Sequence, residues 1–379
     1  MVRFGITPED AEVAASVARF AKEVLARRAQ ELDEHTRSAS VHIPQLAALG
    51  LMGMNLPERW GGAGITPVAL LLSLVEIARA CAATSSLMGA HYLATDSILI
   101  GGDDALRERY LPGAGGGHLL GAFGLTEPGA GSNPAEMSTR AQRAGDVYHL
   151  TGTKHFISNA DEADFIVVYA KTDPEAGHHG ISAFVVDRGT PGLQVAPAEK
   201  LMGLHGSAVH EVHLDCDVPA AQRLGAEGTG FVTAMKVLDN GRLDVAATCL
   251  GIAEAALSEA VAWAQQRVVG GKPLSHRQGI QWKLADMKVR LDAAWALALQ
   301  AACKRVAGED FAAESSTAKL YASEAVAYIT DEALQIHGGY GYTRDLPLER
   351  HVRDARILRI YEGSSEIQRV IIARQLFRS

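Results

Sequence analysis

The sequence has little cysteine: its 379 residues include four, Cys81, Cys216, Cys249 and Cys303, and none of them forms a CxxC pair. This argues against a disulfide framework or a zinc site and fits a reducing cytoplasm. The N-terminus lacks the apolar region of a signal peptide, and no run of 18 apolar residues occurs, so we expect no membrane span. A net charge of −8 argues against nucleic-acid or anionic-membrane partners.

The hydrophobic pattern changes twice along the chain. Up to about residue 118 apolar residues recur at helical spacing, and the helical spacing returns in long segments after about 225. Between these limits short segments alternate with period two. We therefore predict an α+β fold with an N-terminal helical domain over 1–118, a central small β-barrel or sandwich over 119–224, and a C-terminal antiparallel helical bundle over 225–379.

The pattern also predicts the main elements. Thr7 before Pro8 is typical of a helix start, with Asp10 in the first turn. Further helices are expected near 43–51, 67–82, 85–99, 103–110, 227–268, 275–308, 310–337, 346–357 and 366–377, and strands near 139–144, 147–152, 164–170, 181–187 and 210–215. The glycines at 113–117 are expected to make a flexible exit from the first domain.

The stretch 353–368 places a carboxylate at a break between two helices. Glu362 follows Tyr361, and Ser364 can cap the last helix with Glu366 in its first turn. Burial beside aromatic and apolar groups would raise the pKa of Glu362 and make it a usable general base near neutral pH. Taken alone, such a residue is more often a cap or a surface charge.

A glycine-rich stretch at 122–133 opens the β region. Gly129 and Gly131 would let backbone N–H groups approach a ligand closely, and Thr126 and Ser132 supply hydroxyl groups. Such a loop could cradle phosphates or a flat heterocycle, although it matches neither a Walker loop nor GxGxxG. Its last residue, Asn133, is expected to cap a short helix.

Two other stretches carry groups suited to a ligand. In 151–159 Phe156 and Ser158 could stack on a ring and hydrogen-bond its edge, although in isolation an ordinary hairpin is the favoured explanation. Asp239 and Arg242 either pair with each other or leave Arg242 free for an anionic or amide-rich ligand.

A third group lies in the C-terminal half. Gln335–Tyr342 ends a helix with glycines that permit close approach of a phosphate or adenine, and Arg267 and Gln278 are candidates for the same ligand.

Two other stretches are not expected to bind a ligand: 270–273 lacks the Ser or Thr of a P-loop, and His178–His179 lacks the spacing of a metal site. The arginines at every third position from 350 to 359 indicate a salt-bridged or subunit-contact face.

Together these motifs resemble the acyl-CoA dehydrogenase family over essentially the whole chain, in the family's α-β-α order. Phe123–Ser132 is similar to the first family signature, and Gln335–Tyr342, with Arg353, Asp354 and 360–364, is similar to the second. Two long signatures in the right order outweigh the ordinary explanations given above for each motif.

The resemblance implies a noncovalently bound FAD, with no metal ion. The backbone around Leu125 and Thr126 would contact the flavin ring, Phe156 would stack near it, and Ser158 would bond its N5 edge. The residues implied to hold FAD are Phe123, Leu125, Thr126, Ser132, Phe156, Ile157, Ser158, Arg267, Gln278, Gln335, Gly338, Gly339, Ser364 and Glu366. Those implied to contact the acyl thioester are Ser132, Asp239, Arg242, Tyr361 and Gly363.

Glu362 falls on the family's catalytic-base position. It would remove the α-proton while the β-hydride passes to flavin N5, giving a trans-2-enoyl thioester, and Gly241 stands where some members place their base. The resemblance implies an acyl-CoA substrate, an electron-transferring flavoprotein as acceptor, and a homotetramer built as a dimer of dimers, with part of the FAD site lying across a dimer contact.

Alternatives stay open at this point. The same desaturation could act on an acyl-carrier-protein thioester, the enzyme could be an oxygen-using acyl-CoA oxidase, or the chain could be a non-catalytic acyl-CoA-binding scaffold. The sequence also departs from the family: Phe156 stands where Trp is common, Asn133 replaces a common Asp, Ser364 replaces Thr, Gly270 replaces a usual Phe, and His205 replaces a frequent Arg.

Overall fold

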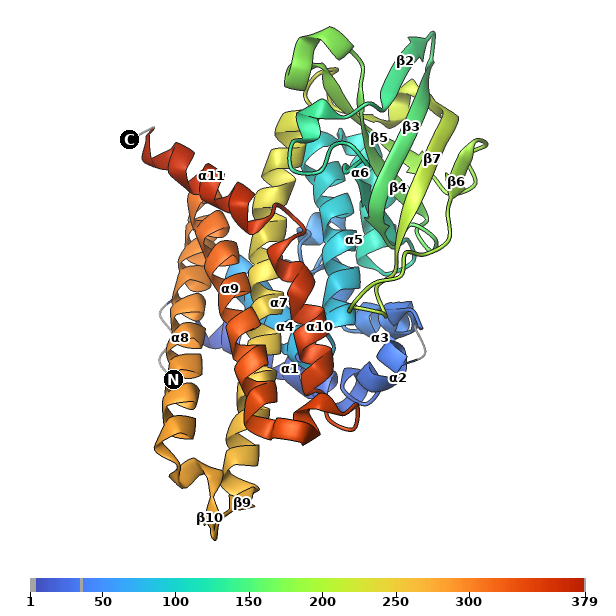
Figure 1. Cartoon of the computed structure of the whole chain (residues 1–379). Helices are drawn as coiled ribbons and strands as arrows, with labels where there is room; N and C mark the ends of the chain where they lie inside the picture. The colour runs from blue at the N-terminus through green and yellow to red at the C-terminus, as the bar shows by residue number, and fades with distance from the viewer. Residues whose placement is uncertain (1–4, 35–36, 378–379) are drawn as a thin grey trace.

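The computed structural model, which describes residues 5–34 and 37–377, has the expected order of helices, sheet and helices. In Figure 1 the long C-terminal helices run side by side, the N-terminal helices pack against them, and the sheet sits beside one end of the assembly. The helices are α1 (Pro8–Phe20), α2 (Ala29–Glu34), α3 (Ile43–Ala48), α4 (Pro67–Ala80), α5 (Ala82–Gly101), α6 (Asp104–Gly115), α7 (Gly230–Gln266), α8 (Gln278–Val306), α9 (Ala312–His337), α10 (Leu348–Arg356) and α11 (Ser365–Leu376). The strands are β1 (Gly121–Gly124), β2 (Arg140–Ala144), β3 (Val147–Ser158), β4 (Phe165–Lys171), β5 (Ile181–Asp187), β6 (Leu193–Val195), β7 (Val209–Pro219), β8 (Arg223–Leu224), β9 (Val268–Val269) and β10 (Lys272–Pro273).

The sheet is mainly antiparallel, in the order β6-β7-β3-β2-β4-β5-β8, with β1 joined in parallel to β4. Strands β3 and β7 alternate between buried and more exposed residues. Strands β4 and β5 are buried at all but their last residue. One face of β4 and β5 packs inside the sheet domain with Tyr148 and Phe184, and the other packs with Phe165 and Tyr169 on helical residues such as Ile98. Burial on both faces explains why β4 and β5 are continuously apolar.

The helical core is built around α7. This helix packs against α4, α5, α8 and α9, so the N- and C-terminal helices share one hydrophobic core. Gly251 permits a close approach of α7 and α4, because a Cβ there would collide with the Val75 carbonyl of α4. In the described part of the chain only α7 is long and apolar enough to cross a membrane; 61% of its most apolar window is buried inside the protein, as in a core helix.

The structure corrects several local expectations. Strand β1 was not predicted, because four residues of Gly-Ala-Phe-Gly carry too little pattern, and β3 and β7 extend beyond their predicted ends. Helix α6 continues to Gly115 rather than ending in a flexible exit; Gly115 is a tight packing position, where a Cβ would lie 2.5 Å from the Gly61 carbonyl oxygen. Asn133 makes no capping hydrogen bond, since 134–136 is only a 3₁₀ turn.

Candidate active site

The loop between α10 and α11 presents Glu362. A 3₁₀ turn over 357–359 ends α10, and Glu362 and Gly363 then take left-handed conformations with φ of 51° and 87°. Left-handed backbone is unfavourable for a non-glycine residue and persists only where its surroundings enforce it. Ser364 then caps α11, its hydroxyl accepting from the Ile367 N–H, as predicted.

Two long side chains enforce this loop conformation. Lys319 of α9 is buried and donates from Nζ to the Gly363 carbonyl at 2.6 Å. Gln368 of α11 donates from Nε2 to the carbonyls of Glu362 and Gly363 at 3.0 and 2.9 Å. The backbone at Glu362 is thus fixed from two helices, which leaves its side chain free to act.

The carboxylate of Glu362 is enclosed and lacks a partner. Its Oε2 atom is buried without a hydrogen bond within the described residues. Burial raises the pKa of Glu362 to about 7, against the opposing effect of the nearby cations Lys319 and Arg242. A carboxyl group with this pKa can exchange a proton near neutral pH, which is what a general base requires.

Gly241 of α7 lies directly against this carboxylate. A Cβ at position 241 would collide with Glu362 Oε2 and would lie 2.7 Å from Cδ2 of Leu93 on α5. The glycine therefore makes room for the Glu362 carboxylate between α5 and α7. A second base cannot occupy position 241 while Glu362 holds this place.

Arg242 and Asp239 resolve the question left open by the sequence. They form an ion pair one turn apart on α7, and both are largely buried. Burial raises the pKa of Asp239 to about 6. Arg242 Nε nevertheless has no partner among the described residues, so the guanidinium keeps a donor for a further ligand.

The glycine-rich stretch and the Phe156 stretch meet in the sheet domain. The backbone N–H of His155 donates to the Thr126 carbonyl at 2.9 Å. Lys154, which is fully buried, donates to the Leu125 carbonyl at 3.2 Å and to Glu127 Oε1 at 2.8 Å. Sequence reasoning missed the ion pair between Glu127 and Lys154, because neither residue stands out in its own stretch.

Phe156 points outward where the hydrogen-bonded pairing of β3 with β7 is interrupted. The register between β3 and β7 shifts between Lys154 and Ile157, and Phe156 has φ of 58°. Its ring stacks on His155 with centroids 4.0 Å apart, yet 57% of the residue stays exposed. Ile157 is buried and Ser158 is half-buried. An outward aromatic fixed in a strained bulge offers a surface to a flat ring.

The neighbouring loop offers space as well as contacts. Leu125 is buried and Phe123 is half-buried against the ring of Tyr169. A Cβ at Gly129 would meet nothing within 4 Å, and Ser132 is exposed at the tip of the loop. These residues fit a flat cofactor with polar edges.

The other implied FAD ligands lie elsewhere in the chain. The guanidinium of Arg267 lies 5.6 Å from the ring of Tyr340, which joins it to the turn containing Gly338 and Gly339. Arg267, Gln278, Gln335 and the two glycines are exposed. They cluster where β9 and β10 close the far end of the bundle, away from the sheet domain (Figure 1). One chain therefore does not bring this group together with Phe156.

The remaining candidates surround the Glu362 loop. Tyr361, Gly363 and Ser364 are half-buried, whereas Glu366 is exposed in the first turn of α11. The Ser364 hydroxyl caps the helix and also lowers the pKa of Glu366.

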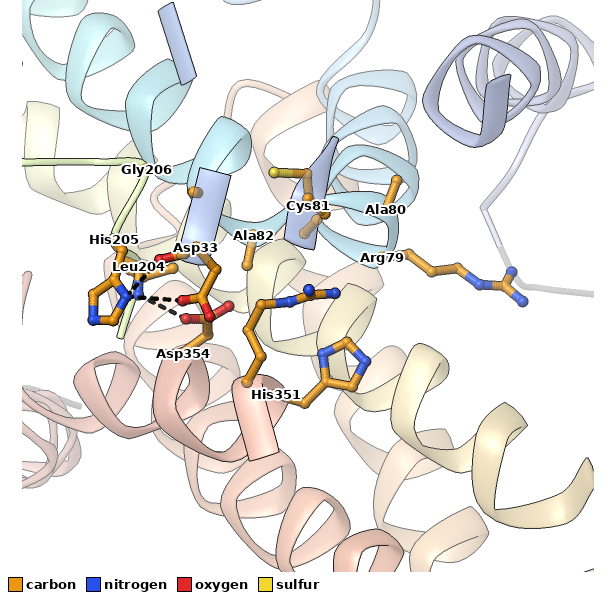
Figure 2. A pocket seen from close by; sticks show the side chains of 14 residues that line it. Asp33, Arg79, Ala80, Cys81, Ala82, Leu204, His205, Gly206, His351 and Asp354 are labelled. Carbon is orange, nitrogen blue, oxygen red and sulfur yellow. Dashed lines mark hydrogen bonds and ion pairs between the residues drawn. The ribbon is translucent and has the colours of Figure 1, made fainter. Parts of the chain in front are cut away.

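The second signature has a structural role at the start of this loop. Arg353 of α10 pairs bidentately with Asp33 of α2, at 2.8 and 2.6 Å, and also with Glu349. Asp354 accepts from the Leu204 N–H at 2.6 Å, and His205 Nδ1 lies 3.0 Å from Asp33 Oδ1 (Figure 2). The substituted His205 thus remains in the network that fixes α10. The cavity lined by Asp33, Leu204, His205 and Asp354 measures about 20 Å³, enough for one water molecule and no substrate.

Within the described residues, no group of three or more His, Cys, Asp or Glu side chains is placed to hold a metal ion. The four cysteines are free thiols, three of them buried.

Family models match nearly all of this architecture. They are the acyl-CoA dehydrogenase N-terminal domain over residues 7–118, middle domain over 122–216 and C-terminal domain over 228–377. The chain therefore belongs to the acyl-CoA dehydrogenase family, a class of FAD-dependent oxidoreductases, and the resemblance inferred from the motifs is confirmed.

Two similar proteins illustrate how far the likeness extends along the chain. The chain is 42% identical over 373 residues to an acyl-CoA dehydrogenase of Bacillus subtilis, which covers 98% of each chain. It is 41% identical over 378 residues to an acryloyl-CoA reductase (NADH) of Anaerotignum propionicum, covering 99% of this chain and 96% of that one.

Solved structures show the same likeness. Butyryl-CoA dehydrogenase from Megasphaera elsdenii superposes with a TM-score of 0.96 at 40% identity, covering 99% of this chain and all of that one. A glutaryl-CoA dehydrogenase from Mycobacterium smegmatis in complex with FADH2 superposes with a TM-score of 0.93 at 31% identity, covering 99% and 96% of the two chains. The predicted α+β fold class is confirmed.

Proposed function

We propose that this protein is an FAD-dependent dehydrogenase of an acyl-CoA thioester and that Glu362 is its catalytic base. The observation that carries the proposal is the enclosed, unpartnered carboxylate with a pKa of about 7, seated where Gly241 makes room for it. Membership of an FAD-dependent family supports the class of reaction.

The residues fit FAD on structural grounds. The outward ring of Phe156, the open space at Gly129 and the hydroxyl of Ser158 suit a flavin ring, with Phe123, Leu125, Thr126, Ser132 and Ile157 around it. The exposed group at the far end of the bundle suits a nucleotide portion. Bound FAD would supply the hydride acceptor for the β-carbon.

The roles of this chain's own residues follow from their positions. Glu362 would take the α-proton as a carboxylate, and its raised pKa makes the transfer less uphill. Lys319 and Gln368 would keep the base in place by fixing its backbone. The unpartnered Nε of Arg242 would meet the substrate, beside Asp239, Tyr361 and Gly363. The apolar side chain of Leu93 on α5, next to Gly241, would help to exclude water from the carboxylate and strengthen these electrostatic effects.

We propose that two copies complete each FAD site. Residues near the β9–β10 end of the bundle in one chain (Arg267, Gln278, Gln335, Gly338 and Gly339) would reach the cofactor held by Phe156 and Ser158 of β3 in another. The reason is that β3 and the β9–β10 end of the bundle lie far apart within a single chain (Figure 1). This requires a homo-oligomer, which we propose to be a dimer of dimers in the cytoplasm. An electron-transferring flavoprotein is the proposed acceptor.

A second candidate is reduction of a 2-enoyl-CoA, the reverse direction. The similarity to an acryloyl-CoA reductase favours it. The same base would then return a proton to the α-carbon. Steady-state turnover of NADH with a 2-enoyl-CoA, supplied with the partner flavoprotein, would identify this direction.

The test is anaerobic mixing of the flavin-loaded protein with saturated acyl-CoA thioesters of varied length and branching. Loss of the yellow flavin colour with at least one thioester is expected. Bleaching by an acyl-carrier-protein thioester alone would identify the carrier-bound substrate, and peroxide formation under air would identify an oxidase. A purified protein that holds no flavin after reconstitution would contradict the proposal and favour a binding scaffold.

A further inference from the structure

The wall beside Glu362 is formed by matching faces of two antiparallel helices. Asn240 of α7 donates to Asp96 Oδ2 of α5 at 2.7 Å, and Gly241 faces Leu93. Further along, Thr248 of α7 and Ser85 of α5 share a hydrogen bond of 2.8 Å. The part of α5 and α7 between the Gly241–Leu93 contact and the Thr248–Ser85 hydrogen bond therefore has the Glu362 carboxylate at one end.

The middle of this stretch is open and polar. Gly89 lies one turn from both Ser85 and Leu93 on α5, and a Cβ there would meet nothing within 4 Å. Asp244 lies at the same level on α7, one turn beyond Gly241. It is 92% buried, since only 8% of it is exposed, and its carboxyl group has no hydrogen-bond or ion-pair partner among the residues that the structure describes.

Other polar groups near this wall are already used by the fold. Asp96 accepts from Asn55 and Asn240 at 2.7 Å each, and the Tyr92 hydroxyl donates to the Leu51 carbonyl. Asp244 differs because its side chain accepts no hydrogen bond from the described residues, and the Thr248 hydroxyl bonds only its backbone carbonyl. Burial raises the pKa of Asp244, the charge of Arg305 opposes this rise, and the charges of Asp96 and Glu362 add to it.

An apolar ligand would leave this carboxyl group unsatisfied. Buried polar groups are paired in nearly all proteins, and covering one with an apolar surface removes its remaining access to water. A ligand that carries an N–H or O–H donor would instead give Asp244 the partner it lacks. An ammonium or guanidinium donor would add attraction to the carboxyl groups of Asp244 and Asp96, against the opposing charge of Arg305.

We propose that Asp244 selects an acyl group that bears a hydrogen-bond donor beyond its β-carbon, so that the substrate is a polar rather than a simple fatty acyl thioester. This rests on the proposed function, because it assigns the acyl group that extends from the carbons next to Glu362. The donor is either a cationic nitrogen or a neutral N–H or O–H group, and both satisfy the same carboxyl group.

The test uses CoA thioesters of matched shape. The 4-guanidinobutanoyl, 4-ureidobutanoyl and 6-methylheptanoyl groups share one heavy-atom skeleton and differ in charge and donors. The 3-guanidinopropanoyl, 3-ureidopropanoyl and 5-methylhexanoyl groups form the same series one carbon shorter, and butanoyl-CoA serves as the plain reference. Dissociation constants are measured by calorimetry on flavin-loaded Glu362→Gln protein, and kcat/KM is measured on the unmodified chain.

At least one donor-bearing thioester is expected to bind and react about tenfold to a hundredfold better than its apolar isostere. Asp244→Leu should reverse this preference. Asp244→Asn keeps the shape of the side chain and removes its charge. If charge contributes, this variant should bind the guanidino thioester no more tightly than the ureido thioester. Asp292→Leu, an exposed change on α8, should leave all the ratios unaltered.

Equal or better binding of the apolar isosteres by the unmodified chain, in both length series, would overturn this inference. So would an unchanged preference in folded Asp244→Leu protein, with folding checked by thermal unfolding. If butanoyl-CoA bleaches the flavin while the donor series shows no advantage, this inference alone fails. If no thioester bleaches it, the proposed function fails, and the binding constants still decide the role of Asp244.

Discussion

At the scale of single residues, the account depends on how burial changes the chemistry of Glu362. An exposed glutamate would be a weak base at neutral pH, whereas this one has a pKa of about 7 because its carboxylate is enclosed. Lys319 and Arg242 limit the rise. The result is a group that is largely ionised just above neutrality and yet basic enough to take a proton.

The first prediction concerns the pH dependence of flavin reduction. Glu362 must be deprotonated to act, so the rate should be low well below pH 7, rise across about pH 7 and level off above it. Stopped-flow reduction by a reactive thioester between about pH 5.5 and pH 9 measures this. A rate that stays constant across the range would argue against a base with this pKa.

The second prediction links the same shift to stability. The pKa of Glu362 is raised from 4.5 to about 7 on folding, so its contribution is fully present below 4.5 and is lost as the pH rises through 7. Glu362→Gln, which stays neutral, should therefore be more stable than the unmodified protein at about pH 8.5, by about 1–3 kcal/mol.

Urea unfolding at two pH values measures this difference, with substrate absent. The gap between the two proteins should shrink towards pH 5. A gap of the same size at both pH values would show that charge on Glu362 is not its origin.

At the scale of elements, the loop proposed to contact the flavin is tied to the sheet by one buried ion pair. Glu127 and Lys154 are almost fully buried, and Glu127 also accepts from the N–H groups of Ser138 and Thr139 at 2.6 and 3.0 Å. These partners lower the pKa of Glu127 to about 2, so its contribution is present above pH 4.5 and is lost as the pH falls towards 2.

The third prediction is that Lys154→Met alone costs about 3–5 kcal/mol of unfolding free energy, because it leaves the Glu127 charge buried and unpaired. The double change Lys154→Met with Glu127→Gln should cost clearly less. Urea unfolding of the two variants and the unmodified protein measures this. Equal losses in both variants would contradict the role given to the pair. Weaker flavin binding by the single variant is expected as well, because Lys154 also holds the Leu125 carbonyl.

Elements also show where sequence reasoning succeeds. The long helices α7, α8 and α9 lie within three residues of their predicted ends, because a period of 3.6 repeats many times in each. The cap at Ser364 was predictable from local chemistry alone. Strand β1 and the full lengths of β3 and β7 were not, since their ends are fixed by neighbouring strands.

Only part of the candidate site is predictable from the sequence, because contacts between distant elements leave no local pattern. Glu362 stood out at a helix break, but its contact with Gly241, 121 residues earlier in the printed sequence, exists only in the folded chain. Asp244 lies inside a continuous helical pattern, and nothing local distinguishes it from a surface acid. Whether a buried group is partnered depends on elements far away in the sequence.

At the scale of the whole molecule, the helical core is continuous, whereas the residues implied to hold FAD fall into two groups, one in the sheet domain and one at the β9–β10 end of the bundle. The bidentate pair of Arg353 with Asp33 joins α10 to the N-terminal helices, so the Glu362 loop is fixed by the same packing that unites both ends of the chain. By contrast, strand β3, which carries Phe156, and strand β9, which directly follows Arg267, lie at opposite ends of the molecule (Figure 1). Such a division requires a second copy if both contact one cofactor.

The fourth prediction tests this division by complementation. Glu362→Gln and Arg267→Glu should each be nearly inactive as pure proteins. Co-expressed and purified through two different tags, the mixed oligomer should regain about a quarter to a half of the unmodified activity, because some sites then combine intact Glu362 with an intact Arg267 from the other copy. Mixed oligomers with no activity above that of the parents would place Arg267 in the same chain's site or outside it.

The most direct test of the central claim is single-turnover flavin reduction in Glu362→Gln protein. Gln has nearly the same shape as Glu and cannot take the proton, so the variant should keep its yellow colour and bind the thioester with a similar dissociation constant. Reduction by a thioester that bleaches the unmodified protein should slow by at least about a thousandfold. A variant that bleaches as fast as the unmodified protein would show that Glu362 is not the base.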